Sequence, residues 1–344
     1  MKAINSVAII GAGMAGLSCA SALQHAGIRV RVFEKSRGVG GRMSTRRGEY
    51  WECDHGAQYF TVSEPVFQEA VRHWCSIGAA AVWSPRLKVL GGERSADPRK
   101  TVVRYVGTPR MTSPASAMAQ SIAIQTSTTV REIQQQAAGW ILNTLESGWI
   151  DETFDCLVLA IPQPQAAVLI NGKQISWERE LDEVEMLPCW ALMAKVDSGV
   201  RVDFDAAFVS QSPLGWLCCN SHKPQRSSQE IWLAHATAVW SQEHLEWAPE
   251  QVLELLTAAF ESVTGLPVQS GSVHRWRYAQ SAPALHSRYL LDDQRALAAC
   301  GDWTNGDKVE GAWLSGYYLA GAITATSSGE RASRRVSEAR PDTF

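Results

Sequence analysis

The sequence lacks the features that would direct the protein to nucleic acid, to a membrane or to an oxidising compartment. Its 344 residues carry a formal net charge of −3, which leaves no basic surplus for nucleic acid or an anionic membrane. No apolar run approaches the ~20 residues that a membrane-spanning helix needs. The eight cysteines include no CxxC pair, the spacing typical of zinc and redox sites. We therefore expect a cytoplasmic protein with reduced thiols, no metal, no membrane contact and no nucleic-acid partner.

The remaining composition is that of an ordinary globular protein, with 45% apolar and 19% charged residues. The length exceeds that of most single cores, so we expect two structural units that share one ligand crevice. The adjacent Cys218 and Cys219 fit either a redox pair or alternate positions of a buried strand, and we favour the strand.

The chain opens with the pattern of a βαβ unit. Residues 7–10 are wholly apolar, residues 14–26 have helical apolar spacing, and residues 28–34 alternate as a second strand. We therefore expect a strand, a helix and a parallel strand in succession.

A glycine motif, Gly11-x-Gly13-x-x-Gly16, joins the first strand to the helix. Glu34 lies at the end of the second strand, 18 residues after Gly16. In a dinucleotide site the three glycines allow a tight turn, close approach of the pyrophosphate and helix–strand packing, while the acid binds the adenosine ribose. FAD and NAD both use this fingerprint, so it leaves the cofactor open.

Two further segments decide between the cofactors. Gly41 and Arg42 follow the second strand, where the loop can cover a pyrophosphate and the arginine can offset its charge. Near the other end, Asp302 follows a predicted strand at 297–300 and is placed to bind the ribityl or pyrophosphate part of a flavin dinucleotide. The helix that begins with Glu310, Gly311 and Ala312 can direct its amides at the flavin ring, where negative charge accumulates on reduction. An NAD dehydrogenase needs no such second element, so the sequence favours FAD.

The rest of the chain alternates between short strands and helices. We expect a helix at 114–122, a meander of strands at 128–134, 140–145 and 150–154, and a buried strand at 156–161 that Pro162 ends. The tryptophan-rich segment 165–275 predicts a mixed sheet, closed by a helix at 249–263.

Several motifs together resemble the flavin amine oxidase-like group and, within it, the renalases, particularly the bacterial ones. They are GAGMAG, GGRM at 40–43, DHGAQYF at 54–60, LAIPQP at 159–164, WRYA at 276–279, and GD followed by EGAWLSG. The resemblance implies an α/β fold like that of p-hydroxybenzoate hydroxylase, with a Rossmann-type FAD domain, a mixed-sheet substrate domain and noncovalent FAD. It also implies cofactor contacts, which by position are Ala15, Glu34, Lys35, Arg42, Gln58, Tyr59, Val130 and Asp302.

This fold implies a discontinuous cofactor domain. We expect the FAD-binding domain at 1–60, 104–165 and 272–326, the substrate domain at 61–103 and 166–271, and a polar tail at 327–344.

The activity that the resemblance implies is the oxidation of 2- and 6-dihydro isomers of NAD(P) to NAD(P)+, with O2 as acceptor and hydrogen peroxide as product. The partners are then a small dinucleotide substrate and O2, while the oligomeric state stays open. The sequence offers no catalytic triad, metal set or paired carboxylates, which suits a dihydropyridine donor because hydride loss restores its aromatic ring without a base.

Four residues are candidates for positioning the substrate. Asn220 and His235 lie in the tryptophan-rich segment, although the first fits a turn and the second a buried core histidine. Trp313 lies inside the flavin motif, and Arg277 fits either a substrate phosphate or a bridge between domains.

Three other functions stay open. An amine oxidase would enclose a neutral amine in an aromatic cage, which fourteen tryptophans allow. A flavin monooxygenase fits less well, because aromatic hydroxylases of this fold usually carry GDAAH where this chain has Gly301-Asp302-Trp303-Thr304. A flavin-binding partner module without oxidase activity is the third.

Overall fold

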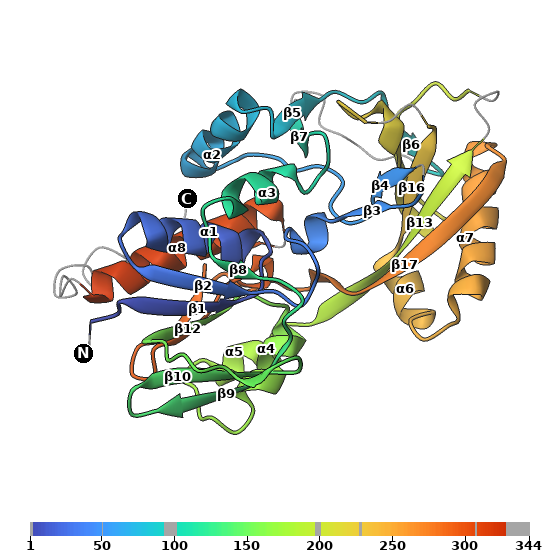
Figure 1. Cartoon of the computed structure of the whole chain (residues 1–344). Coiled ribbons are helices and arrows are strands. Elements are labelled where there is room, and N and C mark those ends of the chain that lie inside the picture. The colour runs from blue at the N-terminus through green and yellow to red at the C-terminus, as the bar shows by residue number, and fades with distance from the viewer. Residues whose placement is uncertain are drawn as a thin grey trace, which may run out of the picture.

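The βαβ unit at the start of the chain is the frame on which the cofactor side of the molecule is built (Figure 1). A computed structural model describes residues 3–49, 51–92, 102–196, 201–226, 229–306 and 308–327. In it β1 (Ser6–Ile10), α1 (Met14–His25) and β2 (Arg29–Phe33) follow one another, and β1 pairs in parallel with β2. The predicted strand, helix and strand are therefore confirmed. Most of the predicted tail lies outside the described residues.

β1 is central in a six-stranded sheet with the order β18-β19-β12-β1-β2-β8. All neighbouring pairs are parallel except β18 with β19. Its other strands are β8 (Ile124–Gln125), β12 (Cys156–Leu159), β18 (Leu290–Asp292) and β19 (Leu297–Ala299). Because carboxyl ends of parallel strands meet at one edge, the segments that follow β1, β2, β12 and β19 converge there.

Both faces of this sheet are covered, as its continuous apolar strands require. Side chains of β1 alternate, so that Val7 and Ile9 join one core cluster while Ala8 and Ile10 join another. Figure 1 shows α1 and α8 (Val309–Ser327) on one face. The other face carries β9 (Val130–Gln136), β10 (Gly139–Thr144), β11 (Gly148–Trp149), α4 (Gln163–Ile170) and α5 (Glu178–Asp182).

The structure corrects the bounds of two predicted elements. The helix expected at 114–122 is α3 (Ser113–Ala119), because the Ile122 amide bonds to the carbonyl of Ala119 in a turn and the helix does not continue. The third strand of the meander is β11 at 148–149. Phe154 forms an isolated bridge with Trp140, on the side of β10 that also carries β11, and its ring lies edge-on against Phe33.

A second six-stranded sheet forms the tryptophan-rich side, as predicted, with the order β17-β13-β16-β15-β14-β6. It is antiparallel except where β14 runs parallel to β6. α6 and α7 pack against one face of it. The elements are β6 (Leu87–Leu90), β13 (Met186–Val196), β14 (Ala206–Val209), β15 (Leu214–Cys219), β16 (Ile231–Ala236), β17 (Val268–Ser281), α6 (Ala238–Glu243) and α7 (Pro249–Thr264).

Cys218 and Cys219 are alternate positions of β15. Cys218 joins the core cluster shared with the cofactor side, and Cys219 joins the cluster beneath α7. Both thiols are free and buried, as the strand interpretation predicts.

Shorter elements join the two sheets. β7, which the sequence assigns to the cofactor domain, pairs with β5, which it assigns to the substrate domain, so the division of domains stays a prediction. These elements are α2 (Pro65–Ser76), β3 (Thr45–Arg47), β4 (Glu52–Asp54), β5 (Ala80–Trp83), β7 (Arg104–Gly107) and the single turns η1 (Gly41–Met43), η2 (Asn220–His222) and η3 (Asp302–Thr304).

Two kinds of feature are absent from the described ranges. No helix there is long and apolar enough to cross a bilayer, and no group of three or more potential ligand side chains could hold a metal ion.

The close packing of α1 and α8 generates a test of the fold. A Cβ at Gly316 of α8 would lie 2.0 Å from the carbonyl oxygen of Ala15, whereas a Cβ at Gly321 of the same helix would meet nothing within 4 Å. We expect Gly316→Ala to lower the free energy of unfolding by about 1–3 kcal/mol, the usual range for overpacking. Gly321→Ala should be neutral or raise it by up to about 1 kcal/mol. Urea unfolding of both variants measures this, and equal effects would contradict the packing.

Candidate functional site

The glycine turn lies at the carboxyl edge of the parallel sheet, and each glycine has a different environment. Gly11 has a φ of +107°, and a Cβ there would lie 2.4 Å from the carbonyl oxygen of Ala160. A Cβ at Gly16 would lie 2.0 Å from the carbonyl oxygen of Gly11. A Cβ at Gly13 would meet nothing within 4 Å. The first and third glycines are therefore required for packing, and the second leaves open space where a pyrophosphate can approach the backbone.

Glu34 ends β2 beside this turn and is buried. Its Oε2 accepts a hydrogen bond from the amide of Ala12 at 2.7 Å, and its Oε1 accepts one from the amide of Ser36 at 2.8 Å. Each carboxylate oxygen has further lone pairs, so the side chain can also accept bonds from ribose hydroxyl groups. The position and orientation of Glu34 fit the fingerprint.

The second glycine loop closes over the first. The Gly40 amide bonds to the Ala12 carbonyl at 2.9 Å, and a Cβ at Gly41 would lie 3.3 Å from the Cα of Gly13. Arg42, which follows, forms an ion pair with Asp302 at 2.5 Å. The two ends of the chain therefore meet at the same edge of the sheet, as the sequence predicted.

These residues fit a flavin dinucleotide better than a nicotinamide dinucleotide. The turn, the acid and the covering loop supply the adenosine and pyrophosphate contacts, and Asp302 with the start of α8 supplies a second element next to them. A Cβ at Gly311 in the first turn of α8 would lie 2.1 Å from the Asn305 carbonyl oxygen, so η3 packs directly on the beginning of that helix.

A buried ion cluster centred on Asp54 lies next to the covering loop. Lys223 and Arg226 approach Asp54 Oδ2 at 3.2 and 2.7 Å, and none of the three side chains has exposed surface. Thr45 donates to Oδ1 at 2.6 Å. Burial alone would raise the pKa of Asp54, but the two cations and the hydrogen bonds outweigh it and lower the pKa to about 2. Asp54 is therefore an ionised anchor and no proton carrier.

Residues 55–58 run from Asp54 back to the covering loop. The Ala57 amide bonds to the Arg42 carbonyl at 2.8 Å, and a Cβ at Gly56 would lie only 1.9 Å from that oxygen. The Gln58 amide donates to the carbonyls of Asp54 and Gly56 and accepts from Cys218 at 2.9 Å. Gln58 therefore fixes the shape of this segment beside the predicted flavin site.

A row of side chains crosses the second sheet on the face that adjoins this segment. Directly paired residues of neighbouring strands point to the same face, and the pairs here run without a break. The row is His274 on β17, Ala191 on β13, His235 on β16, Trp216 on β15 and Phe208 on β14. We call these five residues the ring row.

The main chain of His55 ties the ring row to the cofactor side. Its carbonyl oxygen accepts hydrogen bonds from Trp276 Nε1 at 2.9 Å and from His235 Nε2 at 3.1 Å. Its own ring stacks on Trp276 and meets His274 edge-on, with centroid distances of 5.0 and 4.6 Å. Arg42 adds a further tie, because it donates to the Ala279 carbonyl of β17 at 3.1 Å.

The imidazoles of this cluster are neutral at physiological pH. Burial lowers the pKa of His235 to about 4 and, with the charges of His274 and Arg46, lowers the pKa of His55 to about 3. Burial also lowers the pKa of His274. Within the described residues, His55 Nδ1 is buried without a hydrogen-bond partner.

The other predicted substrate residues lie in different surroundings. Asn220 is buried, where its amide accepts from the Asp54 amide and donates to the Glu52 carbonyl, both at 3.2 Å. Trp313 packs between α8 and α2, against Phe67 and Tyr317. Only His235 of the four lies in the ring row, and the roles of the others toward substrate stay predictions.

Arg277 is an exposed residue of β17, on the face of the second sheet that carries α6 and α7. It holds Glu246 through two contacts of 2.5 and 2.9 Å. His274 and Trp276 point to the other face because neighbouring strand residues alternate.

The remaining predicted cofactor residues are divided between the site and the surface. Tyr59 lies half-buried against Trp216, Ala15 is buried in α1, and Lys35 is exposed. Val130 begins β9 two residues after Thr128, whose amide bonds to the Glu34 carbonyl at 2.9 Å. The Glu310 carboxylate is directed to α2, since it accepts from the amides of Ser63 and Glu64 at 2.7 and 2.8 Å.

Sequence reasoning missed His55, His274 and Trp216 as members of the site. The sequence does carry a signal for His55 and His274. His55 lies inside the DHGAQYF motif, and His274 alternates with Trp276 on a strand. Trp216 has no such local signal, since only the pairing of β15 with β16 brings it beside His235.

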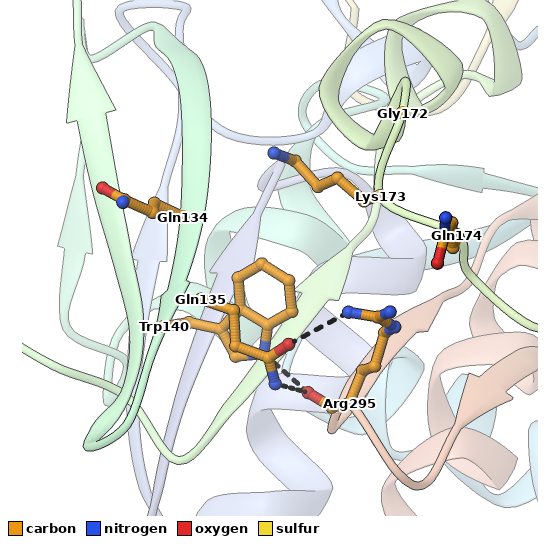
Figure 2. Close-up of a pocket in the computed structure, with 7 residues that line it drawn as sticks. All are labelled: Gln134, Gln135, Trp140, Gly172, Lys173, Gln174 and Arg295. Atoms are coloured by element: carbon orange, nitrogen blue, oxygen red, sulfur yellow. Dashed lines mark hydrogen bonds between the residues drawn. The ribbon is translucent and has the colours of Figure 1, made fainter.

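A polar cavity of about 440 Å³ lies elsewhere, between the β9–β10 hairpin, the loop after α4 and the turn before β19 (Figure 2). Figure 2 shows Trp140 and Gln135 at its centre, where both donate to the Arg295 carbonyl at 2.8 and 3.0 Å. None of its lining residues is a predicted cofactor or substrate residue. The site described above is therefore separate from it.

The depressed pKa of Asp54 generates a prediction of acid sensitivity. The pKa of Asp54 in the folded chain lies below the usual value near 3.9. Its ionisation therefore stabilises the fold above about pH 4, and this stabilisation is lost as pH falls toward 2. A shift of about two units corresponds to roughly 2–3 kcal/mol. We expect Asp54→Asn to be less stable than the parent at pH 6, and the difference to shrink by about that amount at pH 2. Denaturant unfolding across this range measures it, and a difference independent of pH would contradict the ionised anchor.

Two family models match the chain. One describes an NAD(P)-binding Rossmann-like domain and covers residues 9–75. The other describes a flavin containing amine oxidoreductase and covers residues 98–324, which is more than half of the chain.

Curated relatives match over a short stretch. An L-amino-acid oxidase from Siganus canaliculatus is 42% identical over 66 residues, or 19% of this chain and 12% of the relative. A zeta-carotene-forming phytoene desaturase from Myxococcus xanthus is 38% identical over 66 residues, or 19% of this chain and 13% of the relative. The matched stretch is thus a small fraction of those proteins' own length.

Solved structures match over nearly the whole chain and show the fold. A protein assigned as a protoporphyrinogen oxidase from Exiguobacterium sp. 255-15 has a TM-score of 0.74 at 10% identity, covering 93% of this chain and 98% of its own. A putrescine oxidase redesigned in its cofactor binding has a TM-score of 0.70 at 13% identity, covering 93% and 99%. Together with the dinucleotide geometry, the two family models show the cofactor: it is FAD, held noncovalently. The chain belongs to the flavin containing amine oxidoreductase family.

Proposed function

We propose that this protein oxidises 2- and 6-dihydro isomers of NAD(P) to NAD(P)+, with O2 accepting the electrons and hydrogen peroxide as product. The bound FAD supplies the redox chemistry, by accepting hydride from the donor and passing electrons to O2. The observation that carries the proposal is the ring row, a face of flat and neutral groups that can hold a nicotinamide ring without titrating.

The charge state of the surrounding groups supports a reaction that needs no base. His235 and His55 are neutral at physiological pH, Asp54 is held by two cations, and Asp302 is held by Arg42. A dihydropyridine gives up hydride and regains aromaticity, so the protein needs only to orient the donor carbon toward the flavin.

His235 has the hydrogen-bonding pattern expected of an orienting residue. Its Nε2 donates to the His55 carbonyl, which fixes the tautomer and leaves Nδ1 as an acceptor. A nicotinamide carboxamide carries an NH2 donor that this nitrogen can accept. Ala191 lies between His235 and His274 in the ring row.

The renalase-like motifs support the same substrate class, because the DHGAQYF segment carries His55 and Tyr59 and the WRYA segment carries Trp276.

The competing function is that of an amine oxidase. The Trp216 ring lies 5.6 Å from the Tyr59 ring and 4.7 Å from the Phe208 ring, measured between ring centres. Such a group of aromatic rings can also enclose an amine. An experiment on donors separates the two.

The position of Glu34 generates a prediction about cofactor binding. Its removal takes away charge-assisted hydrogen bonds worth roughly 1.5–3 kcal/mol. We expect Glu34→Ala to raise the FAD dissociation constant by about tenfold or more, while hydride transfer in the flavin-loaded fraction changes little because the ribose is remote from the reacting ring. Titration of the apoprotein with FAD measures this, and Glu152→Ala, at a surface ion pair, is the control. An unchanged dissociation constant would remove Glu34 from the site.

The substrate class is tested by anaerobic reduction of the holoenzyme. We expect the 2- or 6-dihydro isomers to reduce the flavin about a hundredfold faster than 4-dihydro NAD(P)H, since a displacement of about 1 Å at the donor carbon has an effect of that order. Primary amines should reduce it negligibly. His235→Ala should slow reduction of the flavin by the preferred isomer at full FAD content. The control is His73→Ala, at an exposed residue of α2, which should leave the rate unchanged. Rapid reduction by an amine, with no response to either isomer, would establish the amine oxidase instead.

A further inference from the structure

Arg104 differs from the other half-buried arginines of the described ranges in having no side-chain oxygen as a partner. Its Nη1 donates to the Val102 carbonyl at 3.2 Å, and its buried Nε has no hydrogen-bond partner within the part of the chain that the structure describes. The others hold side-chain oxygen atoms: Arg31, Arg42, Arg110, Arg226, Arg275 and Arg295.

This arginine is linked to the ring row through Tyr59. It begins β7, which Figure 1 shows between α2 and the sheet that contains β6. Its guanidinium lies 5.2 Å from the centre of the Tyr59 ring, which in turn lies 5.6 Å from the Trp216 ring. Trp216 is the direct neighbour of His235 across the strands. Contacts therefore connect Arg104 to the residue that we propose orients the nicotinamide.

Among the described residues no carboxylate forms an ion pair with Arg104, in contrast to the arginine that the sequence offered for the same role. Arg277, an exposed residue, is already held by Glu246 through two contacts. A guanidinium presents several N–H groups in one plane, which suits two oxygens of a phosphate or carboxylate. Half-burial strengthens such a contact, and the aromatic ring beneath keeps the plane in place.

We infer that Arg104 on its Tyr59 platform is the anion subsite of the substrate pocket and binds the phosphate groups of the dinucleotide whose ring lies at His235. This inference rests on the proposed function and names the residue that holds the remote part of the substrate. The same chemistry would also bind the carboxylate of an amino acid, so the test must separate these two sources.

The test is a binding titration of the oxidised holoenzyme, followed through the flavin absorbance. NAD+ is the probe, inorganic pyrophosphate is the competitor, and L-leucine is the carboxylate probe. We expect Arg104→Gln to raise the NAD+ dissociation constant about tenfold to a hundredfold at unchanged FAD content, as for other charge-assisted contacts. Pyrophosphate should displace NAD+ from the parent protein. In Arg104→Gln, added pyrophosphate should no longer displace it.

Two further variants keep the result interpretable. Arg104→Lys retains the charge without the planar fork and should bind NAD+ with intermediate affinity, which guards against a loss caused by misfolding. Arg72→Gln should bind like the parent, since that side chain is exposed on α2 and pairs only with Glu69 of the same helix. Thermal unfolding of each variant confirms that the proteins compared are folded.

Several results would overturn the inference. NAD+ binding that is unchanged in Arg104→Gln removes the residue from the site. A loss that appears in Arg46→Gln instead moves the anion contact to the histidine end of the ring row, where the charge of Arg46 acts on His55 and His274. If Arg104→Gln weakens the binding of L-leucine but not that of NAD+, the assignment of Arg104 to the phosphate groups is overturned.

The failure of the inference and the failure of the proposed function are distinguishable. If dihydro isomers reduce the flavin but Arg104→Gln binds NAD+ normally, the function stands and the inference falls. If NAD+ and pyrophosphate binding depend on Arg104 but no dihydro isomer reduces the flavin, the anion subsite stands and the proposed reaction falls.

Discussion

Asp54 carries a negative charge at a place without exposed side-chain surface, and three separate parts of the chain converge to compensate it. Lys223 and Arg226 come from the loop after β15, Thr45 comes from β3, and the Met111 amide comes from the turn before α3. Loss of one partner from such a buried pair leaves an uncompensated charge and destabilises a protein by about 3–5 kcal/mol. The ion cluster therefore fixes where residues 55–58 run, and through them where the His55 carbonyl holds the rings of the second sheet.

The parts of the site that the sequence could predict are those built from neighbours in the chain. The turn Gly11 to Gly16 and Glu34 belong to one βαβ unit, whose strands and helix have strong local patterns, and the structure forms that unit. The meeting of Arg42 with Asp302 spans 260 residues, yet it was predictable because both segments carry motifs for one cofactor.

The ring row could not be predicted in the same way. Its members come from five strands, and a shift of one residue in any pairing would turn a side chain to the opposite face. The pairs between Asp54 and the cations are just as remote, at separations of 169 and 172 residues. Arg277 shows the practical consequence, since strand alternation places it on the face opposite Trp276, where it pairs with Glu246, and its role toward substrate stays a prediction.

The two faces of the second sheet are in contact with different parts of the molecule. Leu192, Ala234 and Leu217 pack beneath α7, while their neighbours Ala191, His235 and Trp216 face the cofactor side. Replacement of a residue on one face leaves the packing of the other nearly intact, so the two can diverge independently. In evolutionary terms, such a sheet allows the residues of one face to change while the scaffold stays the same, and solved structures of only 10–13% identity share this fold.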